Sequence, residues 1–366
     1  MNTFIFASGD PLDHVLPHPL SKEPLMHWNI DFSAPLNLFT IKPHDTYFTN
    51  QLFMTLVAAV VVLLIFFVMG RRYAAMSSAG PSKSVPTGFT NLIEAMMQFI
   101  RNDVVRPVLG DKTDRFMPFL WTAFFYILTC NLLGMIPLGD MVGYATSGRV
   151  LHLGGTATGN IMITAGLAFC AFLMIHFSGA KQVYMDLVAG TYGHHHEHEE
   201  EHALHGQGHE FGLAHDTEHP GHHSVDKGMA PPAALAAAPV LYVWNFAPHV
   251  FKPAKVDGPG AFLLLIADVI MWAILLGLEM VGAVIKPFAL AIRLFANMVA
   301  GHVVLASILA LIGGLSGMAM KSTVGPLVAV GCAALSCLEL FVAFLQAYIF
   351  TFLTTLFIGA SVSPEH

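Results

Sequence analysis

The longest apolar stretch of the sequence, residues 261–312, reads AFLLLIADVIMWAILLGLEMVGAVIKPFALAIRLFANMVAGHVVLASILALI. A helix of this length would measure about 75 Å, whereas the hydrocarbon core of a bilayer is about 30 Å thick. The helix must therefore tilt strongly, bend or run partly along the membrane. Pro287 is the expected position of a bend, because proline interrupts helical hydrogen bonding.

The rest of the chain has the composition of a membrane protein. Of 366 residues, 55% are hydrophobic and 11% are charged, whereas soluble domains are about a quarter charged. No basic stripe suggests nucleic acid as a partner. Further apolar runs cover residues 51–70, 116–137, 160–179 and 324–358. We predict an all-α membrane protein with about five transmembrane helices, of which the last two form a long tilted hairpin.

The polar segments predict the orientation. Lysine and arginine are enriched in cytoplasmic loops. The segment after the first run contains Arg71, Arg72, Lys83, Arg101, Arg106, Lys112 and Arg115, whereas the loop 138–159 contains only Arg149. The N-terminus should therefore lie outside and the C-terminus in the cytoplasm. Residues 91–105 alternate apolar and polar side chains with helical spacing and predict one amphipathic helix at the membrane surface.

The apolar runs and the predicted orientation divide the chain into four regions. We expect an external N-terminal segment (1–50), a membrane domain (51–358), a cytoplasmic insertion within that domain (about 185–255) and a cytoplasmic tail (359–366). The apolar run Phe4–Ala7 is short for the core of a signal peptide. All four cysteines lie in apolar runs without a C-x-x-C pair and are expected to be packing residues.

The insertion is rich in histidine. Residues 193–223 hold 11 of the 20 histidines of the chain, mixed with acidic residues. We expect a disordered, solvated segment, because the histidines have no fixed spacing that defines a tetrahedral metal site. Loose binding of zinc or nickel ions is the alternative. Its candidate ligands are His194, His195, His196, His198 and His202.

Ionisable residues inside apolar runs are costly to bury and are functional candidates. Residues 261–312 contain Asp268, Glu279, Lys286, Arg293 and His302, and the final run contains Glu339 and Gln346. On a continuous helix the first four of these fall within about 20° of one stripe. Arg293 is the strongest candidate, because apolar residues flank it on both sides.

A hairpin between the last two runs predicts two polar zones at different depths. Glu339 and Gln346 are seven residues apart and share a helical face. The hairpin would bring His302 toward Glu339 and Arg293 toward Gln346. Histidine and glutamate can pass protons by changing their protonation state. Arginine keeps its charge, and it therefore attracts a passing carboxylate instead.

Three motifs resemble subunit a of F-type ATP synthases. They are KPFALAIRLFANMVAGH (286–302), ELFVAFLQAYIF (339–350) and NLLGMIP (131–137). The resemblance covers most of residues 51–358 apart from the histidine-rich insertion. It implies a non-catalytic stator subunit beside a rotating ring of c subunits, with two offset half-channels that carry protons to and from a carboxylate on the ring.

The matching motif positions imply roles for individual residues. Arg293 matches the essential arginine that faces the ring. Asn297 and Gln346 match polar neighbours of that arginine and of the proton path, and His302 and Glu339 match a pair in the outer half-channel. Glu279 matches an acidic position on the cytoplasmic side, or simply pairs with Lys286.

The resemblance also implies partners and a location. The partners are the c-subunit ring, b-type peripheral stalk subunits, the whole ATP synthase and the lipid bilayer, with no cofactor. The transported ion is H⁺, with Na⁺ as the alternative because the ion site is expected on the ring. The bacterial plasma (inner) membrane is expected rather than an organelle membrane. A secondary transporter is the rival class, but no second copy of the Arg293 motif is present. A structural anchor would leave Arg293, His302 and Glu339 unexplained.

Overall fold

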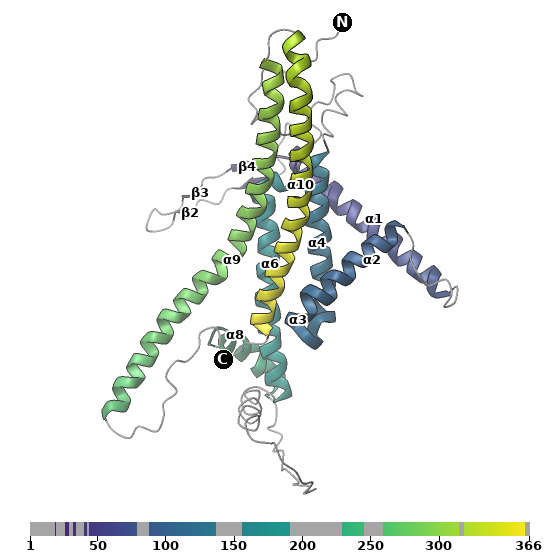
Figure 1. Ribbon diagram of the computed structural model, residues 1–366. Coiled ribbons are helices and arrows are strands. Elements are labelled where there is room, and N and C mark those ends of the chain that lie inside the picture. The colour runs from purple at the N-terminus through teal and green to yellow at the C-terminus, as the bar shows by residue number, and fades with distance from the viewer. Residues whose placement is uncertain are drawn as a thin grey trace, which may run out of the picture. The chain divides into compact units, whose positions relative to one another are not determined.

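The computed structural model describes residues 19, 26–28, 32–33, 40–41, 44–78, 88–136, 156–190, 229–244, 259–314 and 318–362. Most of them are helical (Figure 1). The α-helices are α1 (Asn50–Ser78), α2 (Phe89–Phe99), α3 (Arg106–Leu109), α4 (Thr113–Met135), α6 (Ile161–Ala189), α8 (Pro231–Trp244), α9 (Pro259–Gly314) and α10 (Met318–Val362). Short helical segments are the π-helix η2 (Ile100–Val105) and the 3₁₀-helices η3 (Gly110–Lys112) and η4 (Ala157–Gly159).

Four short strands precede α1. Strand β1 (Met26–Trp28) pairs antiparallel with β4 (His44–Thr46), and β2 (Phe32–Ser33) pairs antiparallel with β3 (Thr40–Ile41). No pattern in this part of the sequence predicted these strand pairs. They do not alter the fold class, because these strands are two or three residues long and lie outside the membrane-spanning helices.

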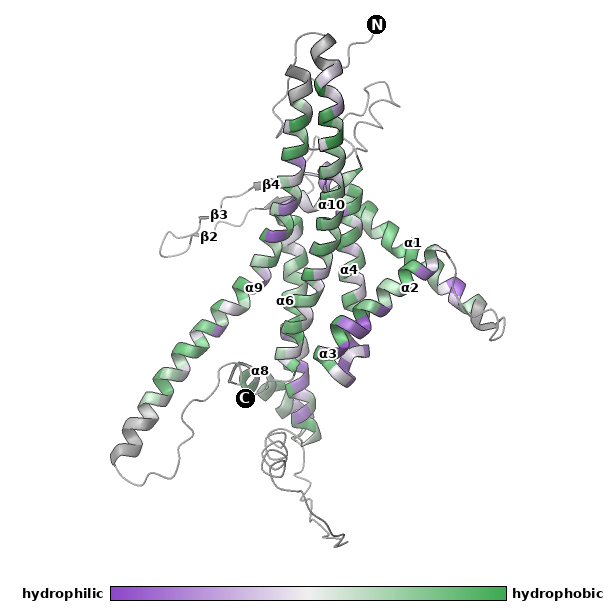
Figure 2. Ribbon diagram, viewed as in Figure 1, coloured by the Kyte–Doolittle hydropathy of each residue, from purple (hydrophilic) through white to green (hydrophobic). Residues whose placement is uncertain are grey.

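Five helical segments of the described chain are long and apolar enough to cross a bilayer. Their hydrophobic colour dominates Figure 2, where hydrophilic turns interrupt it. The segments are Asn50–Ala75, Phe89–Met135, Ile161–Ala189, Val269–Ile308 and Ser322–Val362. Each coincides with or overlaps one of the five apolar runs of the sequence. The prediction of an all-α membrane protein with about five crossings is confirmed.

The chain divides into two units. The first comprises residues 1–170 and 286–356, and the second comprises residues 171–285 and 357–366. The division within α9 falls directly before Pro287, which lies inside the helix without ending it. Proline is tolerated there because helices in membranes satisfy the freed backbone groups through their neighbours. The expected bend at Pro287 stays a prediction.

In the first unit, α1 packs on α4 through a small apolar core. Met54, Ala58, Cys130 and Ala157 are buried together. The hydroxyl of Tyr126 donates a hydrogen bond to a carbonyl oxygen of α1, 3.2 Å away. The contact between the two helices therefore gives the Tyr126 hydroxyl a hydrogen-bond partner, which lipid could not provide.

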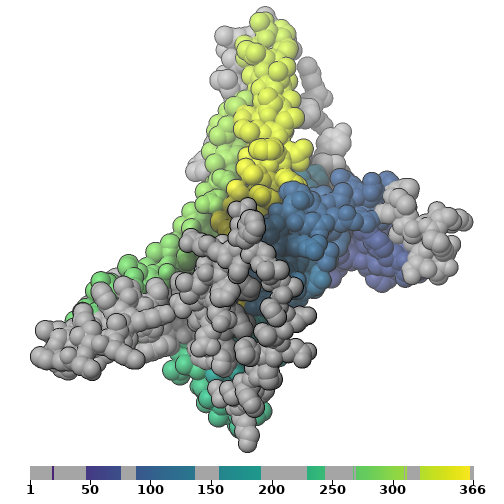
Figure 3. Space-filling view, turned by 60° about the horizontal axis from the view of Figure 1, so that its bottom comes forward, coloured from purple at the N-terminus to yellow at the C-terminus, as the bar shows by residue number. Residues whose placement is uncertain are grey.

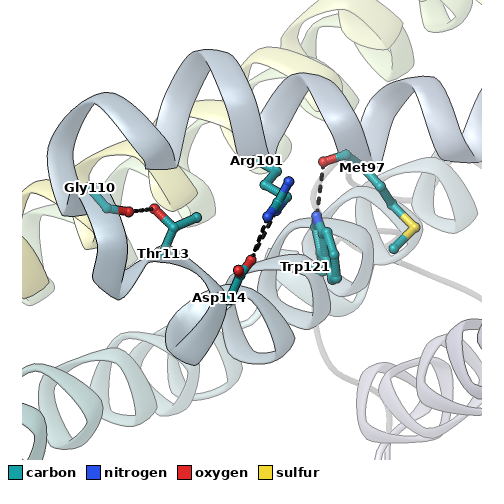
Figure 4. A network of polar contacts seen from close by, with 6 residues as sticks. All are labelled: Met97, Arg101, Gly110, Thr113, Asp114 and Trp121. Atoms are coloured by element: carbon teal, nitrogen blue, oxygen red, sulfur yellow. Dashed lines mark hydrogen bonds and ion pairs between the residues drawn. The ribbon is translucent and has the colours of Figure 1, made fainter.

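The predicted amphipathic helix is α2 with its continuation through η2 and α3. This segment folds back onto α4 (Figure 4). The indole nitrogen of Trp121 donates to the carbonyl oxygen of Met97 at 3.1 Å. Arg101 and Asp114 form an ion pair at 2.8 Å, which contributes little because both side chains are exposed. The reversal itself occurs at Gly110, whose φ is +51°.

The second half of α9 and α10 lie side by side and antiparallel (Figure 1, Figure 3). Asn297 bonds to Gln346, and Gly301 lies against Glu339. The residue numbers on α9 therefore rise as those on α10 fall. The predicted C-terminal hairpin is confirmed.

In the second unit, α8 packs against the C-terminal half of α6. Val183 and Leu187 of α6 are buried against Ala234 and Ala238 of α8. The end of α10 also meets α6, where the Ser361 hydroxyl donates to the Ile175 carbonyl oxygen at 3.1 Å. Helix α8 lies inside the segment interpreted from the sequence as an insertion, and it was not anticipated.

We expect Gly110→Ala to destabilise the protein. A Cβ at Gly110 would meet no atom within 4 Å, so the cost arises from the backbone conformation alone and should be about 1–3 kcal/mol. Gly70→Ala is the matched control, since that site is equally open but helical, where alanine is favoured. Thermal unfolding of the purified protein in detergent measures both. Equal unfolding temperatures for the two variants would contradict the argument.

Candidate functional site

An amide pair, of which Gln346 is buried and Asn297 is exposed, joins the two helices of the C-terminal hairpin. The Asn297 Nδ2 group donates a hydrogen bond to the Gln346 Oε1 atom at 2.9 Å, and Gln346 is 2% exposed. A hydrogen bond between side chains aligns two apolar helices that could otherwise slide past each other. The sequence predicted Arg293 near Gln346. The bond is made by Asn297, one helical turn further along α9.

A second polar zone lies about 7 Å further along α9. The His302 Nε2 atom is within hydrogen-bonding distance of the Thr156 hydroxyl. The Glu339 carboxylate lies against the backbone of Gly301, where an added Cβ would come within 2.5 Å of Oε1. That oxygen is buried and has no hydrogen-bond partner in the described part of the chain. The Glu339 carboxylate therefore lies beside the residue that precedes His302 on α9, and the predicted pairing of the two side chains stays a prediction.

Thr156 belongs to a buried polar connection between three segments of the chain. Next to it, the Thr158 hydroxyl donates to the Asn131 Oδ1 atom at 2.9 Å. The Asn131 Nδ2 group donates to the Ala343 carbonyl oxygen at 3.2 Å. Asn131 and Thr158 are both fully buried. The segment that carries Thr156 is thereby fixed to α4 and α10, which sets the position of the hydroxyl beside His302.

Arg293 is exposed on the surface of the chain. It forms no hydrogen bond or ion pair with any residue that the structure describes. The exposed residues near it on the same side of the helix are Lys286, Ala289, Ala296, Asn297, Ala300 and Val304, whereas Leu290, Leu294 and Met298 are buried. Three of the exposed neighbours are alanines, and none of the six carries a negative charge. An unneutralised cation therefore projects from this surface.

Two further candidates are also residues of α9. Glu279 is half-buried in the first half of α9, and Lys286 is exposed directly before Pro287. Within the described residues, no group of three or more histidine, cysteine or acidic side chains could hold a metal ion. His194, His195, His196, His198 and His202 lie outside the described residues, so their weak metal-binding prediction stays a prediction. All four cysteines are free.

Thr156 and Asn131 are site residues that sequence reasoning missed. Asn131 opens one of the recognised motifs, but nothing in its neighbours along the chain indicates a bond to Ala343. Thr156 lies in a polar loop before α6 and carries no signal of its own. Both contacts join residues more than a hundred positions apart, which no local pattern reveals.

Together, the fold and site define a class of protein. The apolar helices carry a fixed cation and two zones of polar and protonatable side chains. Ionisable residues within membrane helices are typical of membrane proteins that transport ions. The family model described as ATP synthase A chain matches residues 52–195 and 222–359. The chain belongs to this family, whose members are a membrane component of ATP synthase rather than a catalytic subunit.

Similar proteins are found in several organisms. An ATP synthase subunit a of Chloroherpeton thalassium is 33% identical over 88% of this chain and 68% of its own length. One of Chlorobium phaeobacteroides is 31% identical over 88% of this chain and 67% of its own. One of Anaeromyxobacter dehalogenans is 32% identical over 82% of this chain and 56% of its own. The chain thus spans about half to two thirds of the length of these relatives.

We expect Asn131→Leu to destabilise the protein by about 2 kcal/mol, because it leaves the buried Thr158 hydroxyl without its acceptor. The double variant Asn131→Leu/Thr158→Val removes both partners and should be less destabilised than the sum of the single variants. Thermal unfolding in detergent measures the three. Strict additivity would show that the two side chains do not act together.

Proposed function

We propose that this chain is the stator subunit of an F-type ATP synthase that provides two proton half-channels beside a ring of c subunits. The observation that carries the proposal is Arg293, an exposed cation without a partner in the described chain. A guanidinium group within a membrane needs a counter-charge or water, because its transfer into hydrocarbon costs several kcal/mol. A carboxylate on a neighbouring subunit supplies that counter-charge.

The small side chains around Arg293 are consistent with a partner helix that moves past this surface. Ala289, Ala296 and Ala300 share its face, and small residues let a second helix approach closely. Alanine side chains on this face offer little to interlock with a partner helix. A ring of identical helices can therefore pass it, with each carboxylate meeting Arg293 in turn.

Arg293 acts as a fixed charge between two paths. It stays protonated at any relevant pH and so does not carry protons itself. It favours the ionised form of a carboxyl group beside it, which promotes release of the proton on one side. It also repels a proton that would pass directly between the paths. This separation forces the proton to travel with the ring.

His302 and Glu339 form the outer path. Both can exchange protons, and both lie in the zone that Thr156 and Gly301 shape. A proton that passes this zone neutralises a ring carboxylate, and the neutral group can then face lipid at far lower cost than the charged one. Asn297 and Gln346 line the step between this zone and Arg293. Glu279 is the proposed acidic residue of the inner path.

The chain is expected in the plasma (inner) membrane of a bacterium, with its N-terminus outside and its C-terminus in the cytoplasm. The excess of lysine and arginine between α1 and α4 supports this orientation. Proton coupling is proposed rather than sodium coupling, because histidine and glutamate share the outer zone. The partners are the c-ring, b-type stalk subunits and the assembled ATP synthase.

Arg293→Ala should abolish ATP-driven proton pumping in inverted membrane vesicles. Without the positive charge of Arg293, nothing favours the ionised form of the ring carboxyl group, and the proton is not released. Quenching of a pH-sensitive dye measures pumping. Arg101→Ala is the control, since it removes an exposed arginine that pairs only weakly with Asp114, and it should pump normally. Coupled pumping by the Arg293 variant at the normal rate would refute the proposal.

Thr156 is proposed as a positioning residue for His302. Thr156→Val keeps the shape of the side chain but removes the hydroxyl, so His302 loses a hydrogen-bond partner. We expect severalfold slower proton flux and an altered pH profile, with normal amounts of assembled complex. Thr156→Ser keeps the hydroxyl and should restore the flux and the profile. Loss of flux in both variants would indicate packing rather than hydrogen bonding as the role of Thr156.

A further inference from the structure

Helix α8 has no polar face. Its sequence is PPAALAAAPVLYVW, with no charged residue in 14 positions. A helix of this length measures about 21 Å, which is too short to cross about 30 Å of hydrocarbon. A helix that is apolar on all sides is normally surrounded by protein or lipid. The residues that the structure describes cover one of its faces.

The covered face lies against α6. Ala234 and Ala238 are buried in contact with Val183 and Leu187. Alanines one turn apart let two helices approach closely, as in helix pairs within membranes. The opposite face of α8, called here the outer face, consists of Leu235, Ala236, Pro239, Val240 and Val243, all of which are exposed.

The contacts also give the direction of α8. At its start, the backbone N–H of Met229 donates to the carbonyl oxygen of Leu187, the third-last residue of α6, at 2.9 Å. Near its end, the hydroxyl of Tyr242 is 2.9 Å from Nδ1 of His176. Helix α8 therefore runs antiparallel to α6, from the end of that membrane-spanning helix back toward its middle.

The level of α8 in the membrane follows from α6. The last turns of α6 carry Lys181, Gln182 and Asp186 and belong near the lipid headgroups. His176 lies about 16 Å further into the span than Leu187. The start of α8 is thus level with the headgroups and its end is level with hydrocarbon. Figure 2 shows the hydrophilic end of α6, and Figure 1 shows α8 beside it.

The inner end of α8 is held by specific contacts. Tyr242 bonds to His176, so two polar groups at this depth satisfy each other. The Tyr242 ring also fills the space over Gly179, where an added Cβ would come within 2.5 Å of it. Helix α8 is therefore fixed along α6 and is not simply resting on it.

We propose that α8 is a re-entrant helix whose outer face contacts the acyl chains of the lipid leaflet beside the C-terminal end of α6. The apolar surface of α6 at this level already faces outward through Leu173 and Phe177, which are 50% and 69% exposed. On α8, Leu235 and Val240 are 69% and 67% exposed. The outer face continues the lipid-facing surface of a spanning helix, and it has no charged group that would favour water.

The test places single spin labels on the outer face in the assembled complex, reconstituted into phosphatidylcholine and phosphatidylglycerol vesicles. The four native cysteines are first replaced by serine or alanine, and cysteine is then introduced at Leu235, Val240 or Val243. The collision rates of each spin label with oxygen, which is concentrated in hydrocarbon, and with a water-soluble nickel chelate report the depth of the label in the membrane. We expect labels at Val240 and Val243 to favour oxygen, with depth increasing by about 12 Å from Leu235 to Val243. Leu173→Cys on α6 is the lipid-facing reference.

Two results would overturn the proposal. Nickel collisions at Val243 as frequent as at a label in water would mean that α8 lies outside the membrane. Low collision rates with both agents, together with cross-linking to another subunit, would mean that a protein covers the outer face.

A second pair of variants keeps the native cysteines. Val240→Asp should reduce the amount of the subunit in membranes severalfold, because it places a charge in hydrocarbon. Leu235→Asp lies at the headgroup level and should reduce it much less. Equal amounts of the two variants would contradict the proposed depth. Neither experiment depends on proton transport, so its failure would leave the proposed stator role untouched.

Discussion

An arginine in a helix of apolar residues keeps its charge, because guanidinium does not release its proton under physiological conditions. The charge of Arg293 therefore has to be compensated by something that the described chain does not supply. Hydrocarbon does not provide a counter-charge, and the residues near Arg293 on its own helical face, among them Ala289, Asn297 and Ala300, carry no negative charge. In the proposed function, an anionic group on a neighbouring subunit provides this compensation, and the alanines near Arg293 let that subunit approach closely.

The rest of the membrane domain holds that charge at a defined level. Apolar helices in lipid gain little from the hydrophobic effect, so close packing and internal hydrogen bonds determine how they align. The bond between Asn297 and Gln346 sets the alignment of α9 and α10. The bonds of Asn131 then attach α4 and the segment before α6 to the same place on α10. Arg293, Glu339 and His302 consequently occupy fixed relative depths, as the proposed proton paths require.

The sequence predicted the spans and most candidate residues for the same physical reason. Hydrocarbon excludes charge so strongly that long apolar runs and the rare ionisable groups within them stand out. The helical period also indicated that Glu339 and Gln346 share a face. Thr156 was missed, because a threonine in a polar loop has no distinguishing neighbours. Helix α8 was missed because 14 apolar residues are too few for a span and they follow a histidine-rich tract.

The sequence by itself determined the class of protein, the number of crossings and the presence of one permanent charge among apolar residues, because these depend only on composition and spacing. Tertiary structure decided which side chains meet. It paired Asn297 rather than Arg293 with Gln346, set the Thr156 hydroxyl beside His302 and laid α8 along α6. Such contacts join positions far apart in the chain, and they depend on how the helices align. Alignment is set by packing and by buried hydrogen bonds, which no local pattern of residues encodes.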